Sequence, residues 1–292
     1  MTKLNKILLL SVILLGFFQG GLLFLGLNRV DVSPAGTHRS LYVSKSFYDD
    51  AYRLAGDGFD LNDDEVVAAI VPHHLFVKDR SAALFKALSR FDFQRIIMIG
   101  PDHLNDARAS IVISDYDWQT PYGSLSSDSR LVSKILDAGL AATDEQAMGA
   151  EFAISGLVPF VKNSWPEADF VPIIIGTDAE RENLDKLVDF LVENSNGKTL
   201  LLTSVDFSHY KSPAEAEAQD KISVKAIEDF DFERAFTLDV DSPQSIYMIL
   251  KYAARIGANL TQLLSHTNTG LIQPESSQTA VTHNIIVFTK PR

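Results

Sequence analysis

The sequence of 292 residues contains no cysteine. This absence excludes disulfides, thiolate nucleophiles, iron–sulfur clusters and zinc sites built on cysteine ligands. Any metal ion must therefore be held by His, Asp, Glu or backbone oxygen. Glycine and proline are also sparse, with 16 and 11 residues, which excludes a collagen-like chain or a Pro/Gly-rich disordered chain.

Positive charge is scarce as well. The chain has 26 Lys and Arg against 38 Asp and Glu, and its formal net charge is −12. An acidic protein without a cluster of Lys or Arg repels the phosphate backbone of nucleic acids. We therefore expect no nucleic-acid partner, and we expect the ligand to be a small molecule or another protein.

A long apolar run occurs near the N-terminus. Residues 7–27 carry no charge, and a helix of this length would measure roughly 31 Å, about the thickness of a bilayer core. Because Lys3 and Lys6 precede the run, the positive-inside rule predicts a cytoplasmic N-terminus and a domain on the outer side of a membrane. We expect residues 1–30 to form a single-pass anchor, followed by a linker over residues 31–40. A cleaved signal segment, which would leave a secreted protein, is the alternative.

Residues 41–292 show the alternation that is typical of α/β proteins. Short, continuous apolar runs predict strands at Val66–Val71, Arg95–Ile99 and Thr199–Val205, and helical patterns such as Arg181–Glu193 lie between such runs. Strands of this kind belong to sheets that are covered on both faces. We expect one domain, with a central, largely parallel or mixed sheet and helices on both faces.

Three of the seven histidines, His73, His103 and His209, come directly after a predicted strand. Open α/β sheets bind ligands at the carboxyl ends of their strands, so we expect these imidazoles to line one site. Asp241 precedes a helix start at Ser242–Pro243, where free N–H groups stabilise a carboxylate. Two His and one carboxylate are the ligands of mononuclear non-haem Fe(II) sites, and Zn²⁺ is chemically possible too.

Three short segments resemble the motifs of a known family, and they occur in the family's order. Val71–Phe76 resembles P-H-A-G-[YW], Gly100–His103 resembles G-P-S-H-H, and Ser204–Tyr210 resembles S-S-D-[FL]-[SC]-H-[YW]. These motifs belong to the Memo family, also called AmmeMemoRadiSam system protein B. The resemblance covers roughly residues 35–292. It implies a fold similar to that of the LigB-type class III extradiol dioxygenases, which use non-haem iron.

The resemblance also implies roles for individual residues. His73 and His103 fall on the family's first two metal-ligand positions, and Asp241 stands where the third ligand is often Cys. His209 matches the histidine that acts as acid and base in the dioxygenases. Asp206 is expected either to orient His209 or a ligand through a hydrogen bond, or to close an Asx turn at the strand end. The expected cofactor is Fe(II), with zinc or copper as alternatives.

The sequence departs from the family within Glu151–Phe160, which matches the frame E-H-S-I-E-x-x-x-P-[FY]. Phe152 replaces the histidine of this frame, and Ser155 replaces its second glutamate. Three functions therefore stay open: an iron-dependent dioxygenase or other oxidoreductase, a non-catalytic, membrane-anchored binding module, and a metal-dependent hydrolase. The family further implies two cytosolic partners, an AMMECR1-like protein and a radical SAM enzyme, which a domain outside the membrane would not meet.

The remaining histidines are expected to have lesser roles. His74 should point away from His73, because neighbours in an extended chain point in opposite directions. We expect His38 to lie in the linker, His283 to flank a strand, and His266 to be a plain turn residue, with a place at the rim of the pocket as the alternative.

Overall fold

The predicted strands form the centre of the fold. The computed structural model describes residues 36–61, 65–272 and 279–291. Eight strands form one mixed sheet in the order β10-β11-β2-β9-β3-β8-β4-β7. Their bounds are β2 (Glu65–Val71), β3 (Arg95–Pro101), β4 (Ile111–Ile113), β7 (Ala142–Thr143), β8 (Asp169–Ile175), β9 (Thr199–Ser204), β10 (Leu260–Asn268) and β11 (Thr282–Lys290).

The middle of this sheet is parallel. Strands β2, β9, β3 and β8 pair side by side in the same direction, whereas β11 and β10 are antiparallel additions at one edge, and β4 pairs antiparallel to β8. The mixed sheet that the apolar runs predicted is therefore confirmed. Because β2, β9 and β3 are parallel neighbours, the loops that follow them leave the sheet at the same edge.

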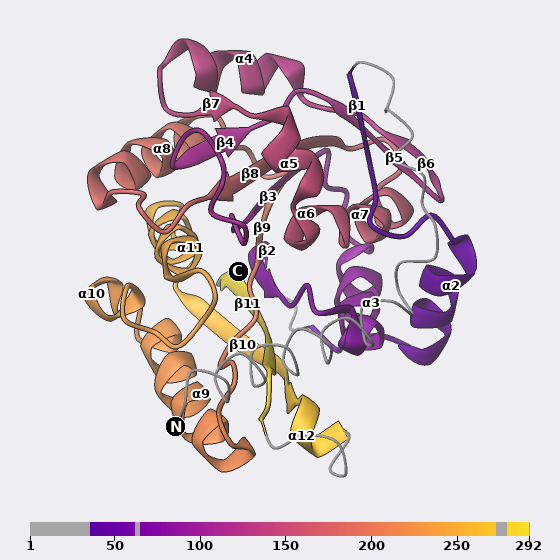
Figure 1. Cartoon of the computed structure of the whole chain (residues 1–292), viewed down its shortest axis with the longest axis vertical. Coiled ribbons are helices and arrows are strands. Elements are labelled where there is room, and N and C mark those ends of the chain that lie inside the picture. The colour runs from indigo at the N-terminus through magenta and orange to yellow at the C-terminus, as the bar shows by residue number, and fades with distance from the viewer. Residues whose placement is uncertain (1–35, 62–64, 273–278, 292) are drawn as a thin grey trace, which may run out of the picture. The chain divides into compact units, whose positions relative to one another are not determined.

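Helices cover both faces of the sheet (Figure 1). They are α2 (Lys45–Leu54), α3 (Lys78–Leu88), α4 (Ser129–Asp137), α5 (Glu145–Ala150), α6 (Phe152–Ser155), α7 (Val158–Ser164), α8 (Arg181–Glu193), α9 (Pro213–Glu228), α10 (Phe232–Ala235), α11 (Pro243–Arg255) and α12 (Thr269–Ile272), with a 3₁₀ turn η1 (Leu75–Val77). The predicted helix over Arg181–Glu193 is confirmed as α8.

Each face of the sheet has its own hydrophobic core, because successive side chains of a strand point to opposite faces. In β3, Ile97 and Ile99 pack into the core beneath α8 and α11. Ile96 and Met98 of the same strand pack into the second core, beneath α3 and α7. All four side chains are buried, which explains why the strand is apolar without alternation.

A second sheet lies beside the first, and the sequence did not predict it. It has the order β1-β5-β6, with β1 (Thr37–Arg39), β5 (Asp117–Thr120) and β6 (Gly123–Leu125). Strand β1 lies within residues 31–40, where we expected a linker. His38 is therefore a strand residue: it is buried, and its Nε2 lies 2.8 Å from Glu145 Oε2.

The predicted fold class included a membrane-spanning helix near the N-terminus, and this part of the prediction was wrong. None of the helices in the described part of the chain is long and apolar enough to cross a membrane. Residues 7–27, which we expected to cross, lie outside the described residues. The expected single-pass localisation, with the α/β domain on the outer side, is accordingly not supported.

Candidate metal centre

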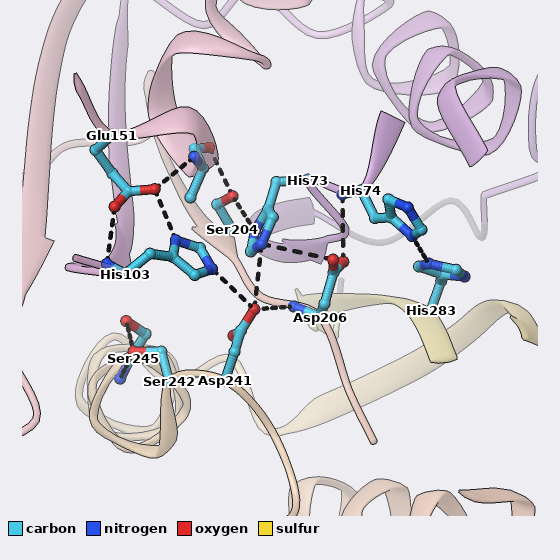
Figure 2. A network of polar contacts seen from close by, with 11 residues as sticks. His73, His74, His103, Glu151, Ser204, Asp206, Asp241, Ser242, Ser245 and His283 are labelled. Atoms are coloured by element: carbon cyan, nitrogen blue, oxygen red, sulfur yellow. Dashed lines mark hydrogen bonds and ion pairs between the residues drawn. The ribbon is translucent and has the colours of Figure 1, made fainter. Parts of the chain in front are cut away.

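Three parallel strands deliver polar side chains to one edge of the main sheet. His73 follows β2 by two residues, His103 follows β3 by two, and Asp206 follows β9 by two. Because β2, β9 and β3 are neighbours, these side chains converge (Figure 2). Asp241 reaches the same place from the start of α11. The next residue, Ser242, is the N-cap of this helix, and its side chain accepts a hydrogen bond from the backbone N–H of Ser245.

The two imidazoles face one carboxylate. His73 Nε2 lies 3.2 Å from Asp241 Oδ2, and His103 Nε2 lies 3.8 Å from the same oxygen. The ligand atoms of the three residues all lie within 4.8 Å of one another. This group of two histidines and one acid could therefore hold a metal ion.

Hydrogen bonds behind the imidazoles determine which ring nitrogen faces Asp241. Ser204 donates its hydroxyl to the carbonyl of Ala153 at 2.7 Å, so its oxygen can accept from Nδ1 of His73 at 3.1 Å. His103 Nδ1 lies 2.8 Å from Glu151 Oε1, and a carboxylate can only accept there. Each ring thus donates from Nδ1 and directs Nε2 at Asp241, which is the arrangement usual for metal-binding histidines.

Glu151 is the best-connected of these supporting groups. Its Oε2 accepts from the backbone N–H of His103 at 2.9 Å, and its Oε1 accepts from the N–H of Ala153 at 2.7 Å. The residue is only 3% exposed. Glu151 therefore fixes both the backbone and the ring of His103.

Asp241 has one oxygen in use and one to spare. Its Oδ2 accepts from the backbone N–H of Asp206 at 3.1 Å. Its Oδ1 is buried and has no hydrogen-bond partner among the described residues. Buried polar atoms without a partner are uncommon in proteins. Asp241 therefore offers Oδ2 next to the two Nε2 atoms and a second, unpaired oxygen on the same carboxylate, so the residues fit a metal ion.

Electrostatics strengthen this fit. Burial disfavours the ionised form of Asp241, but the adjacent His73 and His103 outweigh burial and lower the pKa of Asp241 to about 2. Burial also opposes protonation of His103, yet Asp241 and Glu151 raise its pKa to about 9. The pKa of His73 is raised for the same reason, by Asp206 and Asp241 against burial. Protons on Nε2 of the two rings therefore face Asp241, where a metal ion would bind the same nitrogens.

The two histidines of this group line a cavity of about 360 Å³. Its walls combine polar and apolar side chains, namely Leu41, Tyr42, His73, His74, Leu75, His103, Phe152, Asp206, His209, Tyr210 and Val281. Phe152 stacks on His103 with ring centroids 4.0 Å apart. A larger cavity of about 630 Å³ lies where β3 and β8 begin, at the opposite edge of the sheet, and the described residues that line it include no histidine.

His209 and Asp206 both belong to the cavity wall. The ligand atoms of Asp206, His209 and Asp241 lie within 4.8 Å of one another. Asp206 Oδ2 lies 3.5 Å from His73 Nε2, and its Oδ1 accepts from the backbone N–H of His74 at 3.5 Å. These contacts place the Asp206 carboxylate against His73 and His74.

Two further histidines contact each other next to this group. His74 lines the cavity, and its Nδ1 lies 3.0 Å from Nε2 of His283. His283 does not flank a strand but lies within β11, buried. Burial lowers the pKa of His74, and it lowers the pKa of His283 to about 4.

His266 lies in strand β10 rather than in a turn. It is outside the cavity wall: its Nε2 lies 2.7 Å from Glu217 Oε2, and its Nδ1 lies 2.8 Å from Asn284 Oδ1.

Three residues at the site, Glu151, Ser204 and His283, were not predicted from the sequence to belong to it. Glu151 occupies the first position of the retained frame E-H-S-I-E, and Ser204 occupies the first position of the third motif, so both carried a signal. His283 carried none, because only the pairing of β11 with β2 brings it to the site.

Known proteins support the resemblance. A family profile described as Memo-like protein matches residues 51–285. A MEMO1 family protein of Thermoplasma volcanium is 26% identical over 214 residues, which cover 70% of this chain and 78% of that protein. One of Methanococcoides burtonii is 26% identical over 225 residues, covering 73% of this chain and 83% of the relative.

A solved structure shares the fold. The crystal structure of an uncharacterized protein from Escherichia coli K12 aligns with a TM-score of 0.50 and 11% identity, covering 75% of this chain and 99% of that one. At this identity the likeness concerns the fold alone. The match of the family profile covers most of the chain and agrees with the three motifs, so the chain belongs to the Memo family.

Proposed function

We propose that this Memo-family protein binds a divalent transition-metal ion at His73, His103 and Asp241 and acts as an oxidoreductase of the dioxygenase type on a small molecule. The observation that carries the proposal is the convergence of two Nε2 atoms on Asp241 while their Nδ1 atoms are held from behind by Ser204 and Glu151.

The ligand set favours Fe(II). Two imidazoles and one carboxylate, with positions left for other ligands, are typical of non-haem Fe(II) oxygenases, whereas Mg²⁺ and Ca²⁺ prefer oxygen ligands alone. Zinc and copper also accept imidazole and carboxylate. When bound, Fe(II) would supply the one-electron chemistry that reactions of O₂ require.

His209 is the residue we assign to proton transfer. It lies on the cavity wall and in one group with Asp206 and Asp241. An imidazole nitrogen can accept a proton and give it back, so His209 would take a proton from a substrate hydroxyl or return one. We assign Asp206 to positioning, because its carboxylate contacts His73 and the backbone of His74.

The cavity restricts the substrate to a small, partly apolar molecule. A volume of about 360 Å³ is at the low end for sites that hold small ligands. Leu75, Phe152 and Val281 supply apolar surface to the cavity wall, and four imidazoles and Asp206 supply polar groups. An apolar wall next to charged groups excludes water and strengthens their electrostatic effect on a bound molecule.

Metal analysis of the full-length chain, purified without oxygen, tests the ligand assignment. We expect bound metal to fall at least roughly tenfold in His73→Ala, His103→Ala and Asp241→Ala, because each variant removes a ligand. His266→Ala is the matched control, since it removes a histidine that lies outside the cavity wall. Metal content near that of the wild type in all three ligand variants would refute the assignment.

Oxygen uptake tests the reaction. With catechols as first candidate substrates, we expect uptake that depends on iron and declines in His209→Gln while bound metal stays unchanged. Zinc as the bound metal, with ester or amide hydrolysis and no oxygen uptake, would instead identify a hydrolase. Iron binding without turnover of any candidate substrate would identify a binding module.

A further inference from the structure

A second group of metal-binding side chains lies beside the first. His74, Asp206 and His283 have ligand atoms that all lie within 4.8 Å of one another. His74 comes directly after His73, whereas His283 comes from β11, which pairs antiparallel with β2 in the register Ile286↔Ile70. Continued past the end of β2, this register brings His283 next to His73 and His74.

The two imidazoles of this group face each other at a distance that suits a shared cation. Nδ1 of His74 lies 3.0 Å from Nε2 of His283. Two nitrogens that bind one ion at about 2.0–2.1 Å, at angles between a right angle and a tetrahedral one, lie roughly 2.8–3.4 Å apart. The rings therefore need little movement to bind the same ion.

A single proton between these two nitrogens can account for their contact, because one ring donates and the other accepts. A cation would take the place of that proton. The ring that carried the proton would then hold it on its other nitrogen. In His283 that other nitrogen, Nδ1, is buried and has no hydrogen-bond partner in the described part of the chain. A proton on this Nδ1 would find no acceptor there, a cost in free energy that binding of the ion must offset.

Asp206 lies between the two groups. Its Oδ2 is 3.5 Å from His73 Nε2 in the first group, and its Oδ1 is 3.5 Å from the backbone nitrogen of His74 in the second (Figure 2). The residue is 2% exposed, so its carboxylate has little access to bulk water. Because its two oxygens face different groups, one carboxylate could contact both ions, and ions in two-metal sites lie about 3.5–4 Å apart.

We propose that the chain binds a second divalent transition-metal ion at His74, His283 and Asp206, and that Asp206 links this ion to the one held by His73, His103 and Asp241. The link rests on the proposed function, whereas the second ion does not. Two imidazoles and one carboxylate select Fe, Co, Zn or Cu over Mg²⁺ and Ca²⁺. His74 lines the cavity, so the ion can enter where the substrate does.

Titration with Co²⁺ tests this proposal. The full-length chain, with metal removed by a chelator, is titrated without oxygen while heat and visible absorption are recorded. We expect two equivalents for the wild type and one equivalent for both His74→Gln and His283→Gln. His266→Gln is the matched control and keeps two equivalents, because it makes the same change on the neighbouring strand β10.

The outcomes separate this proposal from the first one. One equivalent in the wild type, unchanged in the two variants, would overturn the second ion and leave the first in place. Two equivalents in all variants would overturn the ligand assignment. No binding by the wild type would overturn both proposals. His74→Gln and His283→Gln should each still bind one equivalent of Co²⁺, which shows that these variants are folded. The absorption spectrum of this bound Co²⁺ should match that of the first equivalent bound by the wild type.

Discussion

Glu151 offers the sharpest test of how the proposed metal centre is built, because it touches no metal itself. We expect Glu151→Gln to weaken metal binding although all three proposed ligands remain. A glutamine has one oxygen where the glutamate has two, and its amide nitrogen cannot accept a hydrogen bond. Glu151 accepts from the ring of His103 at 2.8 Å and from two backbone N–H groups at 2.9 and 2.7 Å, so glutamine leaves at least one of these donors without an acceptor.

The size of the effect follows from these contacts. Loss of a carboxylate behind a metal-binding histidine typically costs about 10- to 100-fold in metal affinity. That factor corresponds to about 1.4–2.8 kcal/mol of binding free energy. An unsatisfied buried donor costs about 1–3 kcal/mol of folding free energy, and Glu151→Ala leaves all three donors unsatisfied. Glu151→Ala should therefore be the less stable of the two variants.

Competition with a chromophoric chelator measures the affinity, and urea unfolding measures the stability. Glu145→Gln is the matched control, because Glu145 also accepts from a histidine, His38 at 2.8 Å, away from the cavity. We expect this control to lose stability without losing metal affinity. Metal affinity within about twofold of the wild type in Glu151→Gln would refute the role of Glu151 behind His103.

Further predictions concern other contacts. In Ser204→Ala, the Nδ1 of His73 loses its partner, so metal affinity should fall by roughly tenfold as measured by chelator competition, and unchanged affinity would contradict the assigned orientation of the ring. His209→Gln should keep its metal and lose about 10²- to 10⁴-fold in the rate of oxygen uptake, whereas a full rate would exclude proton transfer by His209. Burial opposes protonation of His266, but Glu217 and the other groups that contact it raise its pKa. The protonated ring of His266 then stabilises the folded state fully below about pH 6.5, and this stabilisation is lost as the pH rises through the raised pKa of His266 in the folded protein. The stability difference between the wild type and His266→Gln in urea unfolding should therefore be larger at about pH 6 than at about pH 10, and a constant difference would contradict this coupling.

Local patterns in the sequence predicted the central strands of the main sheet and the shared edge of His73 and His103, although they missed β10, and the family resemblance added Asp241 to the site. Continuous apolar runs identify strands that are buried on both faces, and parallel neighbours deliver their following loops to one edge. The Ser-Pro pair after Asp241 marks the start of α11. These features depend on residues that are close in the sequence.

The features that the sequence did not predict depend on distant pairing. Strand β1 has only three residues, too few for a hydrophobic period, and it forms by pairing His38 with Trp118. His283 meets His74 because β11 returns antiparallel to β2, from 209 positions along the chain. Glu151 reaches His103 across 48 positions.

Apolarity alone also predicted a membrane helix at residues 7–27, which lie outside the described residues.

Anomalous diffraction from crystals loaded with Fe(II) under anaerobic conditions tests the central claim most directly. We predict a peak at about 2.0–2.2 Å from His73 Nε2, His103 Nε2 and a carboxylate oxygen of Asp241. A peak whose ligands do not include Asp241, or full iron loading with no peak in this cavity, would contradict the account.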